Sequence, residues 1–396
     1  MAMRQLACNF EPMDTWFFRD SRPQGSFGAS EMGSVFPPPV RTLLGAVRTA
    51  IGDAWHAKHG SNWRDFEDNA ALRAVIGFGD DLGNLRVQGP WLVWRGQRLY
   101  PAPLNLMHKS GVYFLMPLGN AVRCDLGTVR LPVLPARVKG LEDLAGAKPV
   151  EGAWLTQKGW ASLLQGQAPS AADVVSSAEL FLPEPRLGIG RDNARGAVTE
   201  GMLYQTRHLR MADGLQVGLS VVGLSSAPQD LGMPAHLLVR LGGEGRQAMF
   251  SLQSQDSHAD AIAPVKLAVG DGTQPTAMLY NVTANPCAPG QPAGIPAGFE
   301  RKSAAMPDGA DVWEGQLGDV RLRIFAAVTG RAVREGGWDL ARHQSRAVQS
   351  LTPAGSALYV TSIEGDLNRL HDQAMGEQSQ WGRGHYLVGN LPEVGR

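Results

Sequence analysis

The clearest periodic pattern in the chain lies between residues 40 and 55. Apolar side chains recur there at steps of three and four, the spacing of one face of an α-helix. These positions are Val40, Leu43, Leu44, Val47, Ile51, Ala54 and Trp55. Pro39 suits a first helical turn, and Gly60 suits a C-terminal stop. The sequence therefore predicts an amphipathic helix over residues 39–59.

The rest of the chain shows shorter patterns. Apolar runs alternate with glycine and proline turns, as in strands and hairpins. Such runs occupy residues 4–10, 85–103, 111–118, 129–135, 201–211, 215–224, 235–252, 320–328 and 356–363. Two further helices are predicted, over residues 63–76 and, with Thr156 as cap, over 153–166. The Ala-, Pro- and Gly-rich residues 284–310 predict a mobile loop.

This order of elements predicts an α+β fold in two halves. A chain of 396 residues is long enough for two domains. Residues 170–181 form a plausible seam, so we place the domains at 1–178 and 179–396. The 48 glycines and 26 prolines argue against an all-helical protein.

Composition narrows the function classes. Lys+Arg and Asp+Glu are both 37, so a net-basic coat for nucleic acid is excluded, although a local basic groove is not. Cys8, Cys124 and Cys287 are too sparse for a disulfide framework or a zinc site. No apolar run is long enough for a transmembrane helix, and the N-terminus has no signal-peptide pattern. We therefore expect a cytoplasmic protein without a membrane partner.

Several residue groups carry weak signals for catalysis or cofactor binding. His56 and His59 form a spacing that occurs by chance, as does the dipeptide at residues 371–372. Residues 77–81 (GFGDD) resemble the magnesium-binding turn of nucleotidyl cyclases, but no second acidic strand accompanies them. Residues 188–190 begin like a dinucleotide fingerprint that fails at Asn193. We therefore expect no metal, no cofactor and no catalytic residue.

A stronger signal is the pairing of arginine with glycine or turn residues. It recurs in residues 17–23, 188–196, 242–246 and 381–384. Glycine lets backbone N–H groups approach a phosphate, and arginine adds a bidentate fork. Phe17, Phe18 and Tyr204 are candidates to stack on bases. These loops suit an RNA backbone, although each alone fits an ordinary solvated turn.

The same segments resemble a known family. The motifs are, in order, FEPMDTWFFRDSRP, FPPPVRTLLGAVRTAIG, YPAPLNLM, WLT, RLGIGRDNARGAVTEGMLY, LGGEGR, GGWD and PAGSALYV. This ordered set, which spans nearly the whole chain, is similar to the third subunits of the Cmr complex. That complex is the type III-B CRISPR–Cas effector, and these subunits belong to the RAMP superfamily of RNA-recognition-motif-like proteins.

The resemblance implies two ferredoxin-like domains with long inserted loops. It also implies a non-catalytic subunit that binds the repeat-derived 5′ handle of the CRISPR RNA (crRNA). The expected protein partners are the large polymerase-like subunit and the backbone RAMP subunits. The candidate RNA-binding residues are Arg19, Arg22, Arg41, Gly188, Gly190, Arg191, Arg195, Arg246 and Arg383. For Arg19, an ion pair with Asp20 or another acid is an equal alternative.

Three other interpretations stay open from the sequence. The chain could be a RAMP-type endoribonuclease that processes CRISPR precursor RNA with His208 or His343 as general base. It could contact only proteins, in which case salt would have little effect on any RNA association. It could also be the equivalent type III-A subunit, although the ordered motifs favour type III-B.

Overall fold

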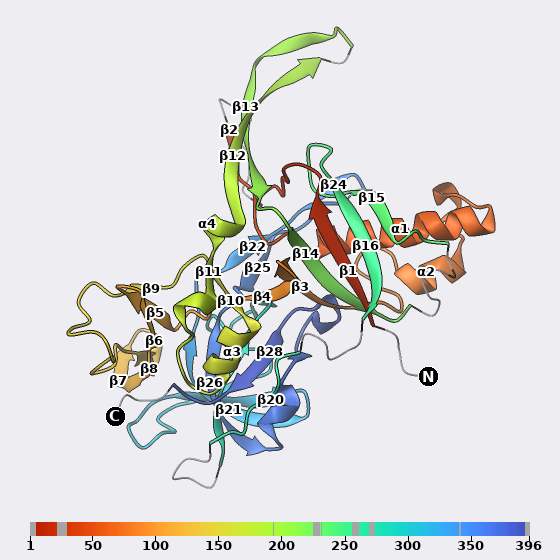
Figure 1. Ribbon diagram of the computed structural model, residues 1–396. Coiled ribbons are helices and arrows are strands. Elements are labelled where there is room, and N and C mark those ends of the chain that lie inside the picture. The colour runs from red at the N-terminus through yellow and green to blue at the C-terminus, as the bar shows by residue number, and fades with distance from the viewer. Residues whose placement is uncertain are drawn as a thin grey trace. The chain divides into compact units, whose positions relative to one another are not determined.

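The computed structural model describes residues 5–21, 30–192, 194–224, 230, 232–255, 261–268, 274–339 and 342–392. The fold is mixed α+β and rich in strands, as the sequence predicts (Figure 1). Its helical elements are α1 (Val40–His59), η1 (Trp63–Asp65), α2 (Ala70–Ile76), α3 (Gln157–Leu164), η2 (Ala171–Asp173), α4 (Ser177–Leu180), η4 (Leu367–Leu370) and η5 (Ser379–Trp381).

The chain divides into two compact units, each made of three segments. Unit 1 comprises Met1–Gly96, Ala178–Ser257 and Arg334–Gln349, and unit 2 comprises Gln97–Ser177, His258–Val333 and Ser350–Arg396. The predicted ranges 1–178 and 179–396 each contribute to both units. One crossing between the units falls at Ser177 and Ala178, beside the predicted seam.

Unit 1 is built on five neighbouring antiparallel strands of one sheet. In spatial order they are β3 (Arg86–Trp94), β14 (Leu215–Val222), β1 (Gln5–Pro12), β16 (Gln247–Gln255) and β15 (His236–Arg240). Along β1 the alternate side chains of Leu6, Cys8 and Phe10 are buried. This period of two is that of a strand with one face on a core.

The predicted helix over residues 39–59 is confirmed as α1. Its apolar stripe is fully buried at Leu43, Val47 and Ile51 and partly exposed at Ala54 and Trp55. Gly60 ends the helix in the left-handed region, with φ of 64°, where glycine avoids the strain of a Cβ. The prediction of one helix over residues 63–76 is wrong. Asn69 accepts a hydrogen bond from Leu72 N and starts the separate helix α2.

Unit 1 also holds a long β-hairpin, drawn in green in Figure 1. Strand β12 (Phe181–Asp192) pairs with β13 (Ala197–Met211), and β13 pairs in parallel with β2 (Ser30–Met32). A two-residue ladder joins β23 (Trp338–Asp339) to β24 (Gln344–Ser345). The long hairpin corrects one prediction, because residues 188–192 belong to a strand rather than to a glycine loop.

Unit 2 is built on a second antiparallel sheet. Its strands, in spatial order, are β19 (Glu300–Lys302), β20 (Val312–Leu317), β21 (Val320–Val328), β26 (Ala357–Glu364), β17 (Thr276–Asn281), β28 (His385–Gly389) and β27 (Gln373–Ala374). The central strand β17 is buried on both faces. Ala277 and Leu279 join one hydrophobic cluster, and Met278 and Tyr280 join the other. The sheet therefore lies between two cores.

Smaller elements complete unit 2. They are β4 (Gln97–Pro101) with β10 (Ala153–Thr156) and β11 (Val174–Ser176); β5 (Leu106–Lys109) with β6 (Val112–Leu115) and β9 (Lys148–Pro149); β7 (Leu118–Cys124) with β8 (Gly127–Pro132); and β18 (Asn285–Pro286) with β25 (Gln349–Thr352). Strand β22 (Val333–Glu335) lies where the chain enters unit 1. The predicted loop 284–310 includes β18 and β19. The predicted cap is confirmed, since Thr156 Oγ1 accepts from Gly159 N at 3.1 Å.

The two sheets share one strand order. In unit 1 four strands, β1, β3, β14 and β16 in chain order, lie in the spatial order β3–β14–β1–β16, and β15 lies beyond β16 at the edge. In unit 2 the strands β17, β21, β26 and β28 lie in the order β21–β26–β17–β28. In each of these sets of four strands, therefore, the first strand lies between the third and the fourth, and the second strand pairs with the third.

Candidate nucleic-acid interface

The β12–β13 hairpin presents a polar face and an apolar face. Its register pairs Glu184 with His208 and Arg186 with Thr206. Because side chains alternate along a strand, these four residues share one face. The other face carries apolar side chains that are strongly exposed. These are Leu187 at 74%, Ile189 at 53% and Leu203 at 47%.

Three arginines and two carboxylates meet on the polar face. We call this group the arginine cluster; its members are Arg186, Arg210, Arg246, Asp14 and Glu184. Asp14 Oδ2 lies 3.1 Å from Arg186 Nη2 and 3.1 Å from Arg246 Nη1, and Asp14 Oδ1 lies 3.2 Å from Arg210 Nη2. Glu184 pairs with Arg186 and Arg210. Four separate stretches of unit 1 therefore meet at one ionic site.

The electrostatics of the cluster keep both acids ionised. Burial acts to raise the pKa of Asp14, but hydrogen bonds and charge from Arg186 and Arg210 lower it below its usual value. Hydrogen bonds from Arg210 and Arg186 likewise lower the pKa of Glu184. The cluster therefore holds three positive and two negative charges at neutral pH.

His208 lies buried beside this cluster, with 2% of its surface exposed. Its Nδ1 is hydrogen-bonded to Thr15 Oγ1 at 3.1 Å, and its ring stacks on Phe17 at 5.2 Å between centroids. Burial, and then the charges of Arg186 and Arg246, lower its pKa. The ring is therefore a packed, neutral element of the site.

The lowered pKa of His208 predicts a pH-dependent stability. The folded state binds fewer protons than the unfolded state, in which histidine titrates near 6.5. The stabilisation is therefore complete above pH about 6.5 and decreases as the pH falls towards the folded-state pKa. We expect the urea midpoint to fall between pH 7.5 and 5.5, and to fall less in the His208→Gln variant. The matched control is His236→Gln at an exposed histidine; an equal response in all three proteins would contradict the assignment.

The aromatic candidates correct one prediction from the sequence. Phe17 and Phe18 are each only 3% exposed, because Phe17 stacks on His208 and Phe18 packs at a tilt against Trp16. They are core residues and are not free to stack on bases. Tyr204 lies across the ladder from Gly188, and a Cβ at Gly188 would come within 2.3 Å of the tyrosine ring. Gly188 therefore makes room for an aromatic side chain.

A second ionic site surrounds the turn at residues 77–81. Arg41 on α1 pairs with Asp80, and Arg346 Nη1 lies 3.2 Å from the same carboxylate. Arg48 donates to Gly79 O at 3.0 Å, and burial lowers its pKa to about 10. The turn is thus held by arginines. Among the described residues, no group of three or more His, Cys, Asp or Glu side chains is arranged to hold a metal.

The remaining predicted RNA-binding residues are dispersed. Arg19 is exposed and bridges Ser34 through its backbone, whereas Arg22 lies outside the described residues. Arg195 is exposed at the hairpin tip, 3.7 Å from Asp192. Gly190 and Arg191 lie on β12, and the side chain of Arg191 is outside the described part. Arg383, in unit 2, is only 6% exposed.

Of the predicted residues, only Arg246 belongs to the arginine cluster. Reasoning from the sequence missed Asp14, Glu184, Arg186 and Arg210. The available signal was the alternation of charged and apolar residues on both sides of the DNARG turn, as in PEPRLGIG and TRHLRM. Two such runs around a turn predict a hairpin with one charged face.

Two buried histidines of unit 2, His371 and His385, have structural roles. His371 Nε2 is bonded to Ile262 O at 2.7 Å, and His371 Nδ1 accepts from Val388 N at 3.1 Å. His385 Nε2 lies 2.8 Å from Asp372 Oδ1 and is buried. Both rings thus tie loops to strand β28, so the dipeptide at residues 371–372 is part of the packing.

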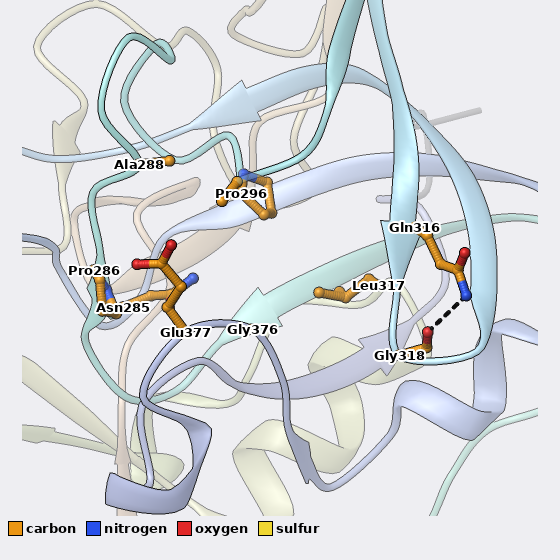
Figure 2. Close-up of a pocket in the computed structure, with 10 residues that line it drawn as sticks. Asn285, Pro286, Ala288, Pro296, Gln316, Leu317, Gly318, Gly376 and Glu377 are labelled. Atoms are coloured by element: carbon orange, nitrogen blue, oxygen red, sulfur yellow. Dashed lines mark hydrogen bonds between the residues drawn. The ribbon is translucent and has the colours of Figure 1, made fainter.

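A pocket in unit 2 is lined by amide side chains that are used within the fold (Figure 2). Asn285 and Glu377 lie on one side of it, and Gln316 and Leu317 lie on the other. Gln316 Nε2 donates to Gly318 O at 3.0 Å, and Asn285 Nδ2 donates to Tyr386 Oη at 3.1 Å. The amides are thus already hydrogen-bonded within the fold.

No helix in the described part of the chain is long and apolar enough to cross a membrane.

Two chains in solved structures are similar to this chain. A chain of the cryo-EM structure of the type III-B Cmr-beta bound to cognate target RNA is 14% identical, with a TM-score of 0.44 over 89% of this chain and 86% of that chain. A chain of the crystal structure of the Csm3-Csm4 subcomplex in the type III-A CRISPR-Cas interference complex is 10% identical, with a TM-score of 0.36 over 98% and 99%. No curated protein matches the sequence.

The family model for CRISPR-associated protein (Cas_Cmr3) matches residues 8–391. The chain therefore belongs to the Cas_Cmr3 family of CRISPR-associated proteins. The resemblance drawn from the ordered motifs, to the third subunits of the Cmr complex, is confirmed. The protein is a subunit of a type III-B CRISPR effector complex.

Proposed function

We propose that the protein binds the repeat-derived 5′ handle of the crRNA within the type III-B effector and does no catalysis. The observation that carries this proposal is the arginine cluster at the base of the β12–β13 hairpin. It joins the predicted Arg246 to Arg186 and Arg210 on one partly exposed surface. The family resemblance indicates which RNA is bound, and the arginine cluster provides the guanidinium groups that would bind its phosphates.

The arginine cluster has more N–H hydrogen-bond donors than its two carboxylates can accept. Each guanidinium carries five N–H donors, whereas Asp14 and Glu184 together offer only four carboxylate oxygens. Arg210 keeps 54% of its side chain exposed. Arginine recognises phosphate through two parallel hydrogen bonds, so the unused donors suit the backbone of an RNA strand. Sequence readout of the handle would come from neighbouring groups.

The apolar face of the same hairpin supports protein docking. Leu187, Ile189 and Leu203 stand close together on adjacent strands and are largely exposed. Contiguous exposed apolar side chains mark surfaces that contact partners. We assign this face to the large polymerase-like subunit and the first backbone RAMP subunits, so that one hairpin serves RNA on one side and protein on the other.

The positions of the two candidate histidines support a non-catalytic role. His208 is buried and stacked on Phe17, so a ribose hydroxyl has no path to its ring. His343 is exposed in the turn between β23 and β24. A general base must lie within hydrogen-bond reach of the proton that it removes. Among the residues that the structure describes, no partner orients the exposed His343 for this task, and His208 has a partner but little access.

The shared strand order of the two sheets supports two ferredoxin-like domains. A ferredoxin-like β-α-β-β-α-β unit has the first strand between the third and fourth, as β1 lies between β14 and β16, and as β17 lies between β26 and β28. In unit 1, α1 occupies the place of the first helix, between β1 and β3. In the described part of unit 2, strands and loops replace that helix.

The test is recovery of partners from the native host. A tagged copy is purified, the bound proteins are identified by mass spectrometry, and the bound small RNA is sequenced. We expect a large polymerase-like subunit and RNAs that share one repeat-derived 5′ end. Incubation of the purified protein with repeat RNA, with and without magnesium, should leave the RNA intact. Recovery of neither partner, or cleavage that is lost in His208→Ala or His343→Ala, would overturn the proposal.

A further inference from the structure

Asp14 sits where three arginine side chains converge. Its carboxylate contacts Arg186 from β12, Arg210 from β13 and Arg246 from the turn before β16. Like charges repel, so an anion among three guanidinium groups stabilises their arrangement on one surface. In the free protein Asp14 supplies an anion that contacts all three, and Glu184 contacts Arg186 and Arg210.

The backbone fixes the position of Asp14. Met13 N donates to Gln247 O at 3.4 Å, and Trp16 exchanges two backbone hydrogen bonds with Leu209, at 2.9 and 2.8 Å. Trp16 itself is fully buried. The loop is thus tied to β16 on one side and to β13 on the other. The carboxylate is therefore presented to the arginines by a rigid support.

The ion pairs are open to solvent. The side chain of Asp14 is 47% exposed, and those of Arg210 and Arg186 are 54% and 31% exposed. Exposed ion pairs of this kind contribute little net free energy, so a competing anion can replace them. A phosphodiester has the same charge as a carboxylate and also presents two anionic oxygens. It fits the same donors.

We propose that Arg186, Arg210 and Arg246 form a binding site for one RNA phosphodiester, and that Asp14 occupies the position of this phosphate until RNA binds. Asp14 keeps the three cations assembled in the free protein, but it also competes with the ligand. The inference rests on the proposed function, since RNA is the source of the phosphate. It adds the location of one phosphate contact and an internal competitor for it.

The substitution Asp14→Asn tests the competition. It preserves the shape of the side chain and removes the negative charge. We expect RNA that carries the repeat-derived 5′ handle to bind about threefold to tenfold more tightly, as measured by fluorescence anisotropy at about 0.1 M salt. The matched control is Asp143→Asn, which makes the same change in net charge at the ion pair with Lys109 in unit 2. The control should leave RNA affinity nearly unchanged.

A second readout separates this proposal from the proposed function. Inorganic phosphate should raise the Tm of Asp14→Asn more than that of the wild type, even if neither protein prefers the handle RNA. Weaker or unchanged RNA binding by a folded Asp14→Asn protein, together with an unchanged response to phosphate, would reject the competition. If Asp14→Asn does not fold, Asp14→Ser replaces it. If neither variant folds, Asp14 is required by the fold and the proposal is rejected.

Discussion

Replacing Arg186, Arg210 and Arg246 together by alanine is expected to weaken binding of the handle RNA by about a hundredfold or more. Each arginine provides a charge-assisted hydrogen bond to phosphate, and such bonds contribute about 1.5–3 kcal/mol. Loss of the one phosphate that these arginines neutralise on a single strand should also reduce the slope of log K against log salt by about 0.7. The measurement is a titration with labelled RNA at four salt concentrations.

The control for this triple variant removes three exposed arginines that lie outside the cluster: Arg64, Arg137 and Arg331. The change in net charge is the same, so any long-range effect of charge appears in both proteins. Equal weakening by the two triple variants would mean that RNA binds through the general field of the protein. Thermal unfolding shows whether each variant is still folded, so that a loss of RNA contacts can be separated from a loss of the fold. The three cluster arginines are partly exposed, so we expect the fold to remain when they are removed.

The substitution Trp160→Ala is expected to destabilise the protein by about 3–5 kcal/mol. Trp160 on α3 is fully buried, and its ring packs edge-on against Tyr280, with centroids 5.3 Å apart. Truncation removes the largest side chain of the cluster between α3 and the sheet of unit 2 and leaves a cavity. Urea denaturation followed by circular dichroism measures the effect.

Trp338→Ala is the matched control, since Trp338 is 58% exposed. The same atoms are removed, but Trp338 buries little surface in the folded protein. We therefore expect the free energy of unfolding to decrease by less than about 0.5 kcal/mol. A loss below about 1 kcal/mol in Trp160→Ala would show that the cluster closes around the gap or that α3 is held by other contacts. The central role assigned to Trp160 would then be wrong.

Local patterns predict the elements that depend on local chemistry. The apolar stripe of α1, its end at Gly60 and the cap at Thr156 can all be read from short stretches of sequence. The prediction of one helix over residues 63–76 is wrong for a local reason that amino-acid composition does not reveal. Asn69 satisfies the N–H of Leu72 and so begins a new helix instead of continuing an old one.

The candidate site was harder to predict because its members come from distant parts of the chain. Arg246 was predicted from a glycine turn, but its carboxylate partner is Asp14, more than 200 residues away in sequence. Glycines in LGIGRD suggested a loop. In the structure Gly188 instead makes room for Tyr204 across a ladder. Pairing between strands decides such positions, and the pairing partner is not encoded nearby.

The two faces of the β12–β13 hairpin constrain how it can change in length. Its side chains alternate with a period of two, with Arg186 on one face and Leu187 on the other. Insertion of a single residue into one strand would move each later side chain to the opposite face. The ionic site and the apolar surface would then exchange places beyond that point. In the regular part of the ladder, from Phe181 to Ile189 and from Leu203 to Met211, viable insertions and deletions should therefore come in pairs of residues, even where the sequence itself varies freely.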